Sequence, residues 1–379
     1  MISLGYSNET IAMMELGLCD GIGPVVGKHL IQQFGSAVAV FEATKSDWQG
    51  MAGINLKLAH QLQLSKDNRC KAAHELANNH VKLNILGTSI ENPDYPFRLK
   101  ELANAPLVLF SKGEIDWNSP RILGIIGTRK PTPLGIALTQ SWIEQLAKYN
   151  IVIVSGLAYG IDIVAHQTAL DAQIPNWGVM AHGLDHVYPT QHRQIAQRMQ
   201  DQHGGLIADF PAYTKMHPDY FPKRNRIVAG LCDALLVVES GVKGGSMITA
   251  SIAHGYNRDV FAIPGRPNDK GSEGCNFMIR HQMAHMARCV GDIVETMGWA
   301  PNPTNSASGS QNGDQLRLFD NLNPIEKQVM QWLIQGIQNP DEMLQQNQWS
   351  ASNIAMALLD LELKGMVTTQ AGNLYTARC

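Results

Sequence analysis

Residues 122–135 read Ile122-Leu-Gly-Ile-Ile-Gly-Thr-Arg-Lys-Pro-Thr-Pro-Leu-Gly135, a short apolar run followed by a glycine-containing turn and a helix start. The apolar run is too short for a helix, so it predicts a buried strand. Pro133 suits the first turn of a helix, because an N–H at that position would have no partner inside the helix. A strand that passes through a tight turn into a helix is typical of parallel sheets.

The same alternation extends over residues 86–300. Short β-rich runs recur at 122–126, 151–154, 177–181, 206–208, 234–238 and 260–263, and helical patterns lie between them at 133–149, 161–170, 223–231, 249–256 and 275–285. This order predicts an α/β fold with a Rossmann-like parallel sheet that helices cover on both faces. Ligands of such sheets bind at the carboxyl ends of the strands, so binding residues are expected in the loops that follow them.

The flanking regions differ in composition from this sheet region. Residues 1–85 are helical in pattern, and Gly21-Ile-Gly-Pro24 between two amphipathic stretches is similar to a helix-hairpin-helix or SAM-like domain. Residues 301–318 are rich in Pro, Asn, Ser and Gly and predict a flexible linker. Residues 319–379 resemble a winged helix, with helices predicted at 323–335, 341–346 and 351–364 and a β-wing at 367–375.

The composition narrows the classes of protein. With 379 residues and 44% apolar residues, the chain predicts two or three folded domains. No apolar run reaches the ~18 residues needed to span a bilayer, and residues 1–10 lack the basic and apolar regions of an export signal, so a cytoplasmic protein is expected. The six cysteines are scattered without C-x-x-C spacing, which favours neither a metal site nor a disulfide framework.

Taken alone, the net charge of -3 disfavours a nucleic-acid ligand, but its distribution along the chain changes that interpretation. Residues 1–85 contain seven basic and seven acidic side chains, and residues 319–379 contain three basic and six acidic ones, so the tail carries the whole deficit. Both flanking domains therefore favour structural or protein-binding roles over contact with DNA. Residues 86–318 contain 20 basic and 20 acidic side chains. The basic ones gather in the loops after the strands, which predicts a small cationic groove.

The first two of these loops contain glycines and charged residues. Gly127, Thr128, Arg129 and Lys130 precede the helix start at Pro133, and this combination predicts phosphate binding. The spacing does not match the dinucleotide fingerprint G-x-G-x-x-G, so no cofactor is expected. The second loop, 155–162, contains Gly156 and ends in Asp162, which with His166 forms either an acid–base or metal-binding pair or an internal brace of the helix. The brace is favoured, because no second ligand pair has matching spacing.

The third and fourth loops complete the candidate groove. Residues 210–226 carry four basic side chains against one acidic side chain, and aromatic residues lie between them. Cations contact phosphates and aromatic rings stack on bases, so this loop favours single-stranded nucleic acid over a solvated basic helix. The loop at 239–250 opens a helix at Gly245 and Ser246 with Lys243 beside it, which is a further anion-binding pattern. No nucleophile–base–orienter set is apparent in these loops, so binding is favoured over catalysis.

Seven motifs in sequential order resemble the DNA processing protein A (DprA/Smf) family. They cover about 180 residues, and they are Ile126-Gly-Thr-Arg129, Ser155-Gly-Leu-Ala-Tyr-Gly-Ile-Asp162 with Ala165-His166, Gly183-Leu-Asp-His-Val-Tyr-Pro189, Phe221-Pro-Lys-Arg-Asn-Arg-Ile-Val-Ala-Gly230, Gly245-Ser-Met-Ile-Thr-Ala250, Val260-Phe-Ala-Ile-Pro-Gly265 and Gly274-Cys-Asn276. One departure is Lys243-Gly-Gly-Ser246, where the family usually has Ser before the second Gly.

The resemblance implies an extended Rossmann-like fold that binds single-stranded DNA as a homodimer, protects incoming strands during natural transformation and helps load the RecA recombinase. It also implies the absence of catalytic activity. The DNA pocket of the family maps onto Gly127, Thr128, Arg129, Phe221, Lys223, Arg224 and Arg226, to which the loop patterns add Lys130, Gly156, Lys243, Gly245 and Ser246.

Two alternative functions stay open at this point. One is an enzyme on a related sheet, such as a nucleoside-monophosphate phosphoribohydrolase. Its Pro-Gly-Gly-x-Gly-Thr loop is only partly imitated by residues 243–249. The other is a scaffold that contacts recombinase without holding DNA itself.

Overall fold

The computed structural model describes residues 6–48, 54–68, 70–301, 323–334, 337, 339–344, 349–363, 367–370 and 374–377. The chain divides into two compact units, residues 1–302 and 303–379. From residue 302 onward, the linker predicted at 301–318 lies outside the described residues. Among the described residues, no helix is both long and apolar enough to pass through a lipid bilayer.

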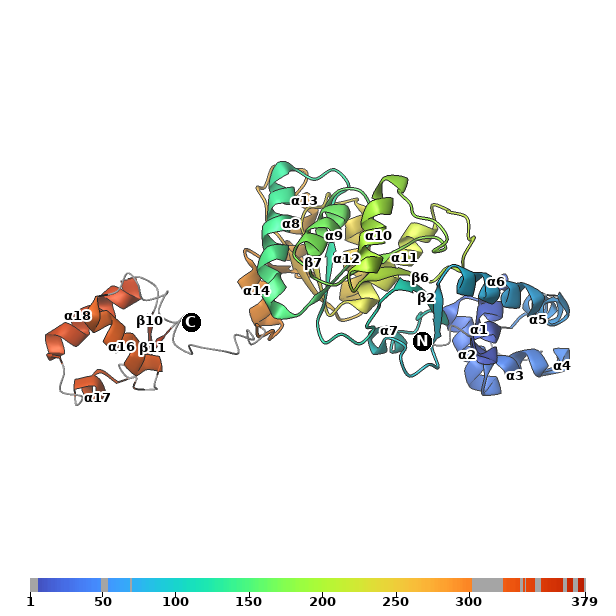
Figure 1. The fold of residues 1–379 in the computed structure, drawn as a ribbon, viewed down its shortest axis with the longest axis horizontal. Helices are drawn as coiled ribbons and strands as arrows, with labels where there is room; N and C mark the ends of the chain where they lie inside the picture. The colour runs from blue at the N-terminus through green and yellow to red at the C-terminus, as the bar shows by residue number, and fades with distance from the viewer. Residues whose placement is uncertain are drawn as a thin grey trace. The chain divides into compact units, whose positions relative to one another are not determined.

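The first unit contains the predicted α/β sheet (Figure 1). The strands are β1 (Leu86–Ser89), β2 (Val108–Gly113), β3 (Ile122–Ile126), β4 (Val152–Ser155), β5 (Asn176–Val179), β6 (Gly205–Ala208), β7 (Ala234–Val237), β8 (Asp259–Ala262) and β9 (His285–Met286). The helices that accompany them are α7 (Phe97–Lys100), α8 (Pro133–Leu146), η1 (Ala147–Tyr149), α9 (Ile161–Asp171), η2 (Thr190–His192), α10 (Arg193–Asp201), α11 (Tyr220–Leu231), α12 (Gly245–Gly255), α13 (Glu273–Arg280) and α14 (Val290–Thr296).

The strand order is β1-β2-β6-β5-β4-β3-β7-β8-β9. The strands from β6 to β9 in this order pair in parallel, which confirms the Rossmann-like prediction. β1 and β2 add an antiparallel edge that the sequence patterns did not predict. The chain moves outward from β3 through β4 and β5 to β6, then returns to β7 on the other side of β3. The reversal makes the end of β3 and β7 the topological switch point of the sheet.

Alternating side chains of the strands supply two buried cores. Leu123 and Ile125 of β3 point to one face and pack with α8, α9 and α14. Ile122 and Ile126 point to the other face and share a core with α11 and α12. Such burial on both faces explains why the strands read as short continuous apolar runs. The paired helices bring the amino ends of α8, α9, α11 and α12 to the carboxyl edge of the sheet.

The amino-terminal helices pack against the β1–β2 edge of the same unit (Figure 1). They are α1 (Asn8–Leu18), α2 (Pro24–Phe34), α3 (Ala37–Glu42), α4 (Lys45–Trp48), α5 (Leu56–Asn68) and α6 (Cys70–Lys82). Most of their buried apolar residues belong to the same core cluster as those of the sheet, whereas Ile11, Ala73 and Ala77 form a small cluster of their own. Contact is close, because a Cβ at Gly27 of α2 would lie 2.6 Å from a methyl group of Leu107. The division of this unit at residue 85 stays a prediction.

The second unit has the elements expected of a winged helix. These are α16 (Pro324–Ile334), α17 (Pro340–Leu344), α18 (Ala351–Leu363), β10 (Val367–Gln370) and β11 (Leu374–Ala377). Asn323 caps α16 by accepting from the backbone N–H groups of Ile325 and Glu326, as its position ahead of Pro324 predicted. The outer face of α18 exposes Met356 and Leu359.

His80 connects the amino-terminal helices to the loop that follows β6. Its Nε2 accepts a hydrogen bond from the backbone N–H of Ala212 at 2.8 Å, and its Nδ1 contacts the hydroxyl of Tyr6 at 2.8 Å. A ring that accepts at Nε2 must be neutral, so Nδ1 donates to Tyr6. Burial lowers the pKa of His80 to about 4, which keeps the ring neutral at physiological pH. His166, completely buried beneath the strand ends, likewise has its pKa lowered by burial to about 4.

These two histidines predict a loss of stability in mild acid. Between the ordinary pKa of 6.5 and the folded value of about 4, the unfolded chain takes up protons that the folded chain does not. The free energy of unfolding should therefore fall as the pH decreases from 6.5 toward 4, and urea titrations across this range measure it. His80→Gln keeps an acceptor near Ala212 and cannot be protonated, so it should weaken the dependence. An unchanged pH profile in that variant would remove His80 from this explanation.

Candidate nucleic-acid interface

Two adjoining cavities lie at the carboxyl edge of the sheet. The larger, of about 470 Å³, has aromatic and thioether side chains in its wall and is called the tyrosine pocket. The smaller, of about 120 Å³, lies between the loops after β3 and β7 and is called the glycine pocket. The two cavities have five residues in common: Arg129, Gly156, Ala158, Phe221 and Arg224. They therefore form one continuous groove at the switch point of the sheet.

A cation stacked on an aromatic ring separates the two cavities. The guanidinium carbon of Arg129 lies 5.7 Å from the ring centroid of Phe221. Arg129 comes from the loop after β3, whereas Phe221 lies in the first turn of α11, so the fold brings together residues 92 positions apart. Arg129 is exposed, and its charge faces solvent along the groove. This pair places a phosphate-binding group and a stacking surface side by side.

The loop after β3 is held from beneath by backbone contacts. The N–H of Thr128 donates to the carbonyl oxygen of Glu239 at 2.7 Å, and the carbonyl oxygen of Thr128 accepts from the N–H of Ile161 at 3.1 Å. Gly160 has φ +82°, and a Cβ there would lie 2.1 Å from the Thr128 oxygen, so this position requires glycine. The contacts join three loops and fix the direction in which Arg129 and the exposed Lys130 leave the sheet.

The amino end of α8 is not open to a phosphate. Thr132 caps it, since its hydroxyl oxygen accepts from the N–H of Gly135. The N–H and hydroxyl of Thr132 in turn donate to the carboxylate of Glu239. An internal carboxylate thus occupies the position that the loop pattern gave to a phosphate. Its negative charge would repel an anion there.

The amino end of α12 is open. Gly244 begins this helix without a side-chain cap, and a Cβ at Gly245 would meet nothing within 4 Å. Ser246 is buried and its hydroxyl contacts that of Ser240 at 2.7 Å. Gly245 and Ser246 line the glycine pocket together with Arg129, so the uncapped start of this helix borders the groove. This is the helix end that suits an anion.

Arg224 forms the floor of the groove and is buried, with 5% of its surface exposed. Its guanidinium donates to the backbone oxygens of Gly156, after β4, and of Val179, in β5. The carboxyl of Asp162 is its charge partner. Burial raises the pKa of Asp162, and the positive charge of Arg224 opposes that shift. A Cβ at Gly156 would lie 2.2 Å from the guanidinium, so Gly156 makes room for Arg224.

Asp162 and His166 act as internal braces, as the favoured interpretation predicted. The carboxylate of Asp162 accepts from the N–H of Gly156 at 3.2 Å, and His166 contacts the side-chain oxygen of Asn176 at 3.0 Å. Within the ranges that the structure describes, no group of three His, Cys, Asp or Glu side chains is placed to hold a metal ion.

The structure therefore divides the predicted site residues. Those that line the groove are Gly127, Arg129, Gly156, Phe221, Arg224, Gly245 and Ser246. Thr128 contributes backbone contacts, and Lys130 and Lys243 are exposed beside the groove loops. Lys223 and Arg226 line a different cavity. Whether each residue touches DNA stays a prediction.

Several groove residues were not singled out from the sequence. Tyr159, Tyr188, Met180, Met216 and His182 line the tyrosine pocket. Tyr159 and Met216 lie in loops in which the sequence patterns had already placed candidate residues. Met180, His182 and Tyr188 lie in the loop after β5, where the only signal was the family motif at 183–189. Leu157 in the same region has φ +51° although it is fully buried. His192 holds this unfavourable backbone by donating from Nδ1 to the Leu157 oxygen at 2.9 Å.

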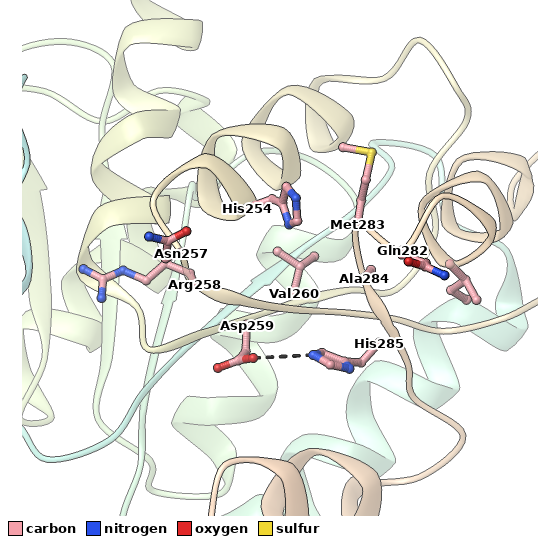
Figure 2. A pocket seen from close by; sticks show the side chains of 10 residues that line it. His254, Asn257, Arg258, Asp259, Val260, Gln282, Met283, Ala284 and His285 are labelled. Atoms are coloured by element: carbon pink, nitrogen blue, oxygen red, sulfur yellow. Dashed lines mark ion pairs between the residues drawn. The ribbon is translucent and has the colours of Figure 1, made fainter.

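A polar cavity of about 500 Å³ lies at the opposite edge of the sheet, where β8 begins (Figure 2). In its lining, Nε2 of His285 lies 3.5 Å from a carboxylate oxygen of Asp259. His254 and Arg258 come from the end of α12 and the turn after it. Arg258 is held by two backbone carbonyl oxygens. The predicted site residues do not line this cavity, so it is separate from the groove.

Comparisons with known proteins agree with the geometry. A family model described as DNA recombination-mediator protein A matches residues 87–298, and one described as DprA winged helix domain matches residues 317–373. The chain is 28% identical to Protein Smf of Synechocystis over 94% of this chain and 96% of that protein.

Two solved structures are similar to this one. The first is DNA processing protein A from Streptococcus pneumoniae, with a TM-score of 0.65 and 27% identity over 76% of this chain and 98% of that chain. The second is DNA processing protein A from Helicobacter pylori, with a TM-score of 0.51 and 28% identity over 56% of this chain and 97% of that chain. The second structure is described as showing a single-stranded DNA binding mode.

The two arginines of the groove should differ in their effect on stability. Arg224→Ala leaves the backbone oxygens of Gly156 and Val179 without their donor and removes the positive charge near the buried Asp162 carboxyl, so it should lower the free energy of unfolding by about 2–4 kcal/mol. Arg129→Ala removes an exposed side chain and should change it by less than about 0.5 kcal/mol. Urea unfolding monitored by circular dichroism measures both. Equal stability of the two variants would contradict the bracing role of Arg224.

Proposed function

Because the chain belongs to the DprA/Smf family of DNA-processing proteins, we propose that it is a recombination mediator that binds single-stranded DNA, protects incoming strands and loads the RecA recombinase during natural transformation. A role in DNA processing and recombination mediation follows from the family itself. The Helicobacter pylori relative, which is described as binding single-stranded DNA, supports this ligand for the groove.

The observation that carries the proposal is the stacking of Arg129 on Phe221 between two cavities. An exposed guanidinium binds a phosphate, while the tyrosine pocket offers apolar and aromatic walls to an unstacked base. In the same cavity as Arg129, the open start of α12 supplies backbone N–H groups to a further phosphate. A paired base inside a duplex cannot enter such a pocket without leaving its stack, so the geometry favours a single strand.

We propose binding without catalysis at this groove. Two of its buried ionisable groups, Asp162 and Arg224, are held by backbone groups of the strand ends, and the positive charge of Arg224 opposes the rise in the pKa of Asp162. The third, His182, donates from Nδ1 to the carbonyl oxygen of Gly183 at 2.8 Å. Groups held in this way stabilise loops and are not free to exchange protons with a substrate. Incubation with nucleoside monophosphates should release no free base, and release would favour the phosphoribohydrolase alternative.

We propose a homodimer that acts in the cytoplasm and contacts RecA. The winged-helix unit supports a protein-binding role, since the outer face of α18 exposes Met356 and Leu359. Exposed apolar residues of this kind favour protein contact over phosphate contact.

DNA affinity should depend on Arg129 through charge. Arg129→Ala should reduce the affinity for oligo-dT by about tenfold and reduce the slope of log K against log[salt] by about 0.7, because one phosphate contact is lost. Lys148→Ala is a matched control, since Lys148 also lies over an aromatic ring, at 5.5 Å from the Tyr149 centroid, but at the opposite edge of the sheet. Fluorescence anisotropy across a salt series measures both variants. Parental binding by the Arg129 variant would show that the groove is not the DNA site.

Recombinase loading should require the same groove. The protein should shorten the delay before RecA assembles on single strands that are already coated with a single-strand-binding protein. Arg129→Ala should restore the delay, whereas Lys148→Ala should not. If the parent binds DNA but leaves the delay unchanged, the loading role fails while the DNA-binding role stands.

A further inference from the structure

A separate cavity of about 420 Å³ lies between the amino-terminal helices and the sheet, and is called the α1 pocket. One wall comes from α1 and the turn before α2 and includes Met13, Met14 and Ile22. The facing wall comes from β2 and the segment before it, with Leu107 and Phe110. The lining is mostly apolar with a few charged groups, and the volume is in the range of pockets that hold a small organic group.

Two glycines leave this pocket open. Gly17, near the end of α1, and Gly23, at the start of α2, both line it, and a Cβ at either would meet nothing within 4 Å. Gly27 in the same region behaves differently, because a Cβ there would press on Leu107. The glycines at 17 and 23 are therefore not required by internal packing. A larger side chain at either position would extend into open space beside the pocket lining.

Cations and stacked aromatic rings lie at the side of the pocket nearest the groove. Lys223 is exposed and lines the pocket, with its ammonium 5.4 Å from the ring centroid of Tyr220. Tyr220 stacks on Phe210, a further lining residue, with ring centroids 4.4 Å apart. Arg226 forms an ion pair with Asp209 in the wall. An ammonium over stacked rings is the combination that suits a phosphate followed by a base.

Helix α11 connects this pocket to the groove. Phe221 and Arg224 line the groove, whereas Lys223 and Arg226 line the α1 pocket. Each pair has the three-residue spacing that places side chains on one face of a helix, so α11 presents one face to each cavity. A helix with its side chains is only about 10 Å across, so a short run of nucleotides is long enough to reach from one cavity to the other.

We propose that the α1 pocket is a second nucleobase site. The DNA strand that occupies the groove continues past Lys223 and places a further base in this pocket. The inference rests on the proposed DNA binding and assigns the amino-terminal helices a direct part in it. The hairpin around Gly21-Ile-Gly-Pro24 then forms a wall for a base instead of binding the backbone of a duplex. The position of the pocket on the other face of α11 from the groove, together with the positive charge of Lys223, favours single-stranded DNA as the occupant over an apolar segment of a protein.

The test fills the pocket without touching the groove. Full-length parent, Gly17→Phe and Gly255→Phe are compared for affinity to oligo-dT of about 4 to about 16 nucleotides. Gly255 is a matched control, because it also lies at the end of a helix and a Cβ there meets nothing within 4 Å, but it lines none of the cavities described above. Gly17→Phe should lose about tenfold in affinity for the longest strands and nothing for the shortest. Gly255→Phe should match the parent at every length.

Cross-linking of the parent provides a second measurement that does not depend on how a variant folds. A strand that contains 4-thiothymidine should cross-link to the α1 peptide with Met13 and Met14 when it is long, and only to groove peptides when it is short. Failure of the parent to bind any strand would refute the proposed function. Binding with no α1 cross-link and no length-dependent loss in Gly17→Phe would overturn the second site and leave the groove intact. Capture of an apolar peptide by the pocket, abolished by Gly17→Phe while long-strand affinity is retained, would also overturn it.

Discussion

The buried guanidinium of Arg224 is the interaction on which the groove depends. It connects α11 to the ends of β4 and β5 through the oxygens of Gly156 and Val179, and its charge is balanced by Asp162 at the start of α9. An arginine can be this deeply buried only where several acceptors surround it, since an unpaired charge in the interior is very costly. The requirement explains why Gly156 has no side chain and why Asp162 follows six residues later. Phe221, one turn before Arg224, is placed at the groove by the same helix.

Helix α11 distributes one basic stretch over two surfaces. In the sequence, a cluster of cations with interleaved aromatic residues predicts a nucleic-acid ligand. In a helix, however, consecutive side chains point in directions about 100° apart, so members of such a cluster face different surfaces. Arg224 therefore lies beneath the groove while Lys223 faces the α1 pocket, and Arg129, from a different loop, is the exposed cation beside Phe221. The contacts between helices and strands, rather than the count of charges, decide which cations reach a ligand.

Much of the fold was predictable because its determinants are local. The strands β3 to β8 and most of the helices between them follow from apolar runs, glycine turns and helix starts, although α10 between β5 and β6 was not predicted. The cap at Asn323 follows from its place before Pro324. The antiparallel strands β1 and β2 were not predicted, because pairing at a sheet edge depends on partners distant in sequence. The sequence pattern also predicted that the amino end of α8 binds a phosphate, and a contact between distant residues likewise argues against that prediction. Glu239, more than 100 residues later, fills that helix end.

The sequence alone determined the class of fold, the edge of the sheet that carries the groove and four of the loops that contribute to it, since these depend on short-range patterns and on the rule that parallel strands end together. The contribution of the loop after β5 became apparent only from the structure. It also determined the family, through motifs kept in order along the chain. The tertiary structure alone decided which residues are exposed and which are braces. Burial made Arg224 a support and Asp162 its counterion, and packing against the sheet placed Gly17 and Gly23 beside an open pocket. Those roles depend on desolvation and on contacts between distant segments, which residue types and spacing do not contain.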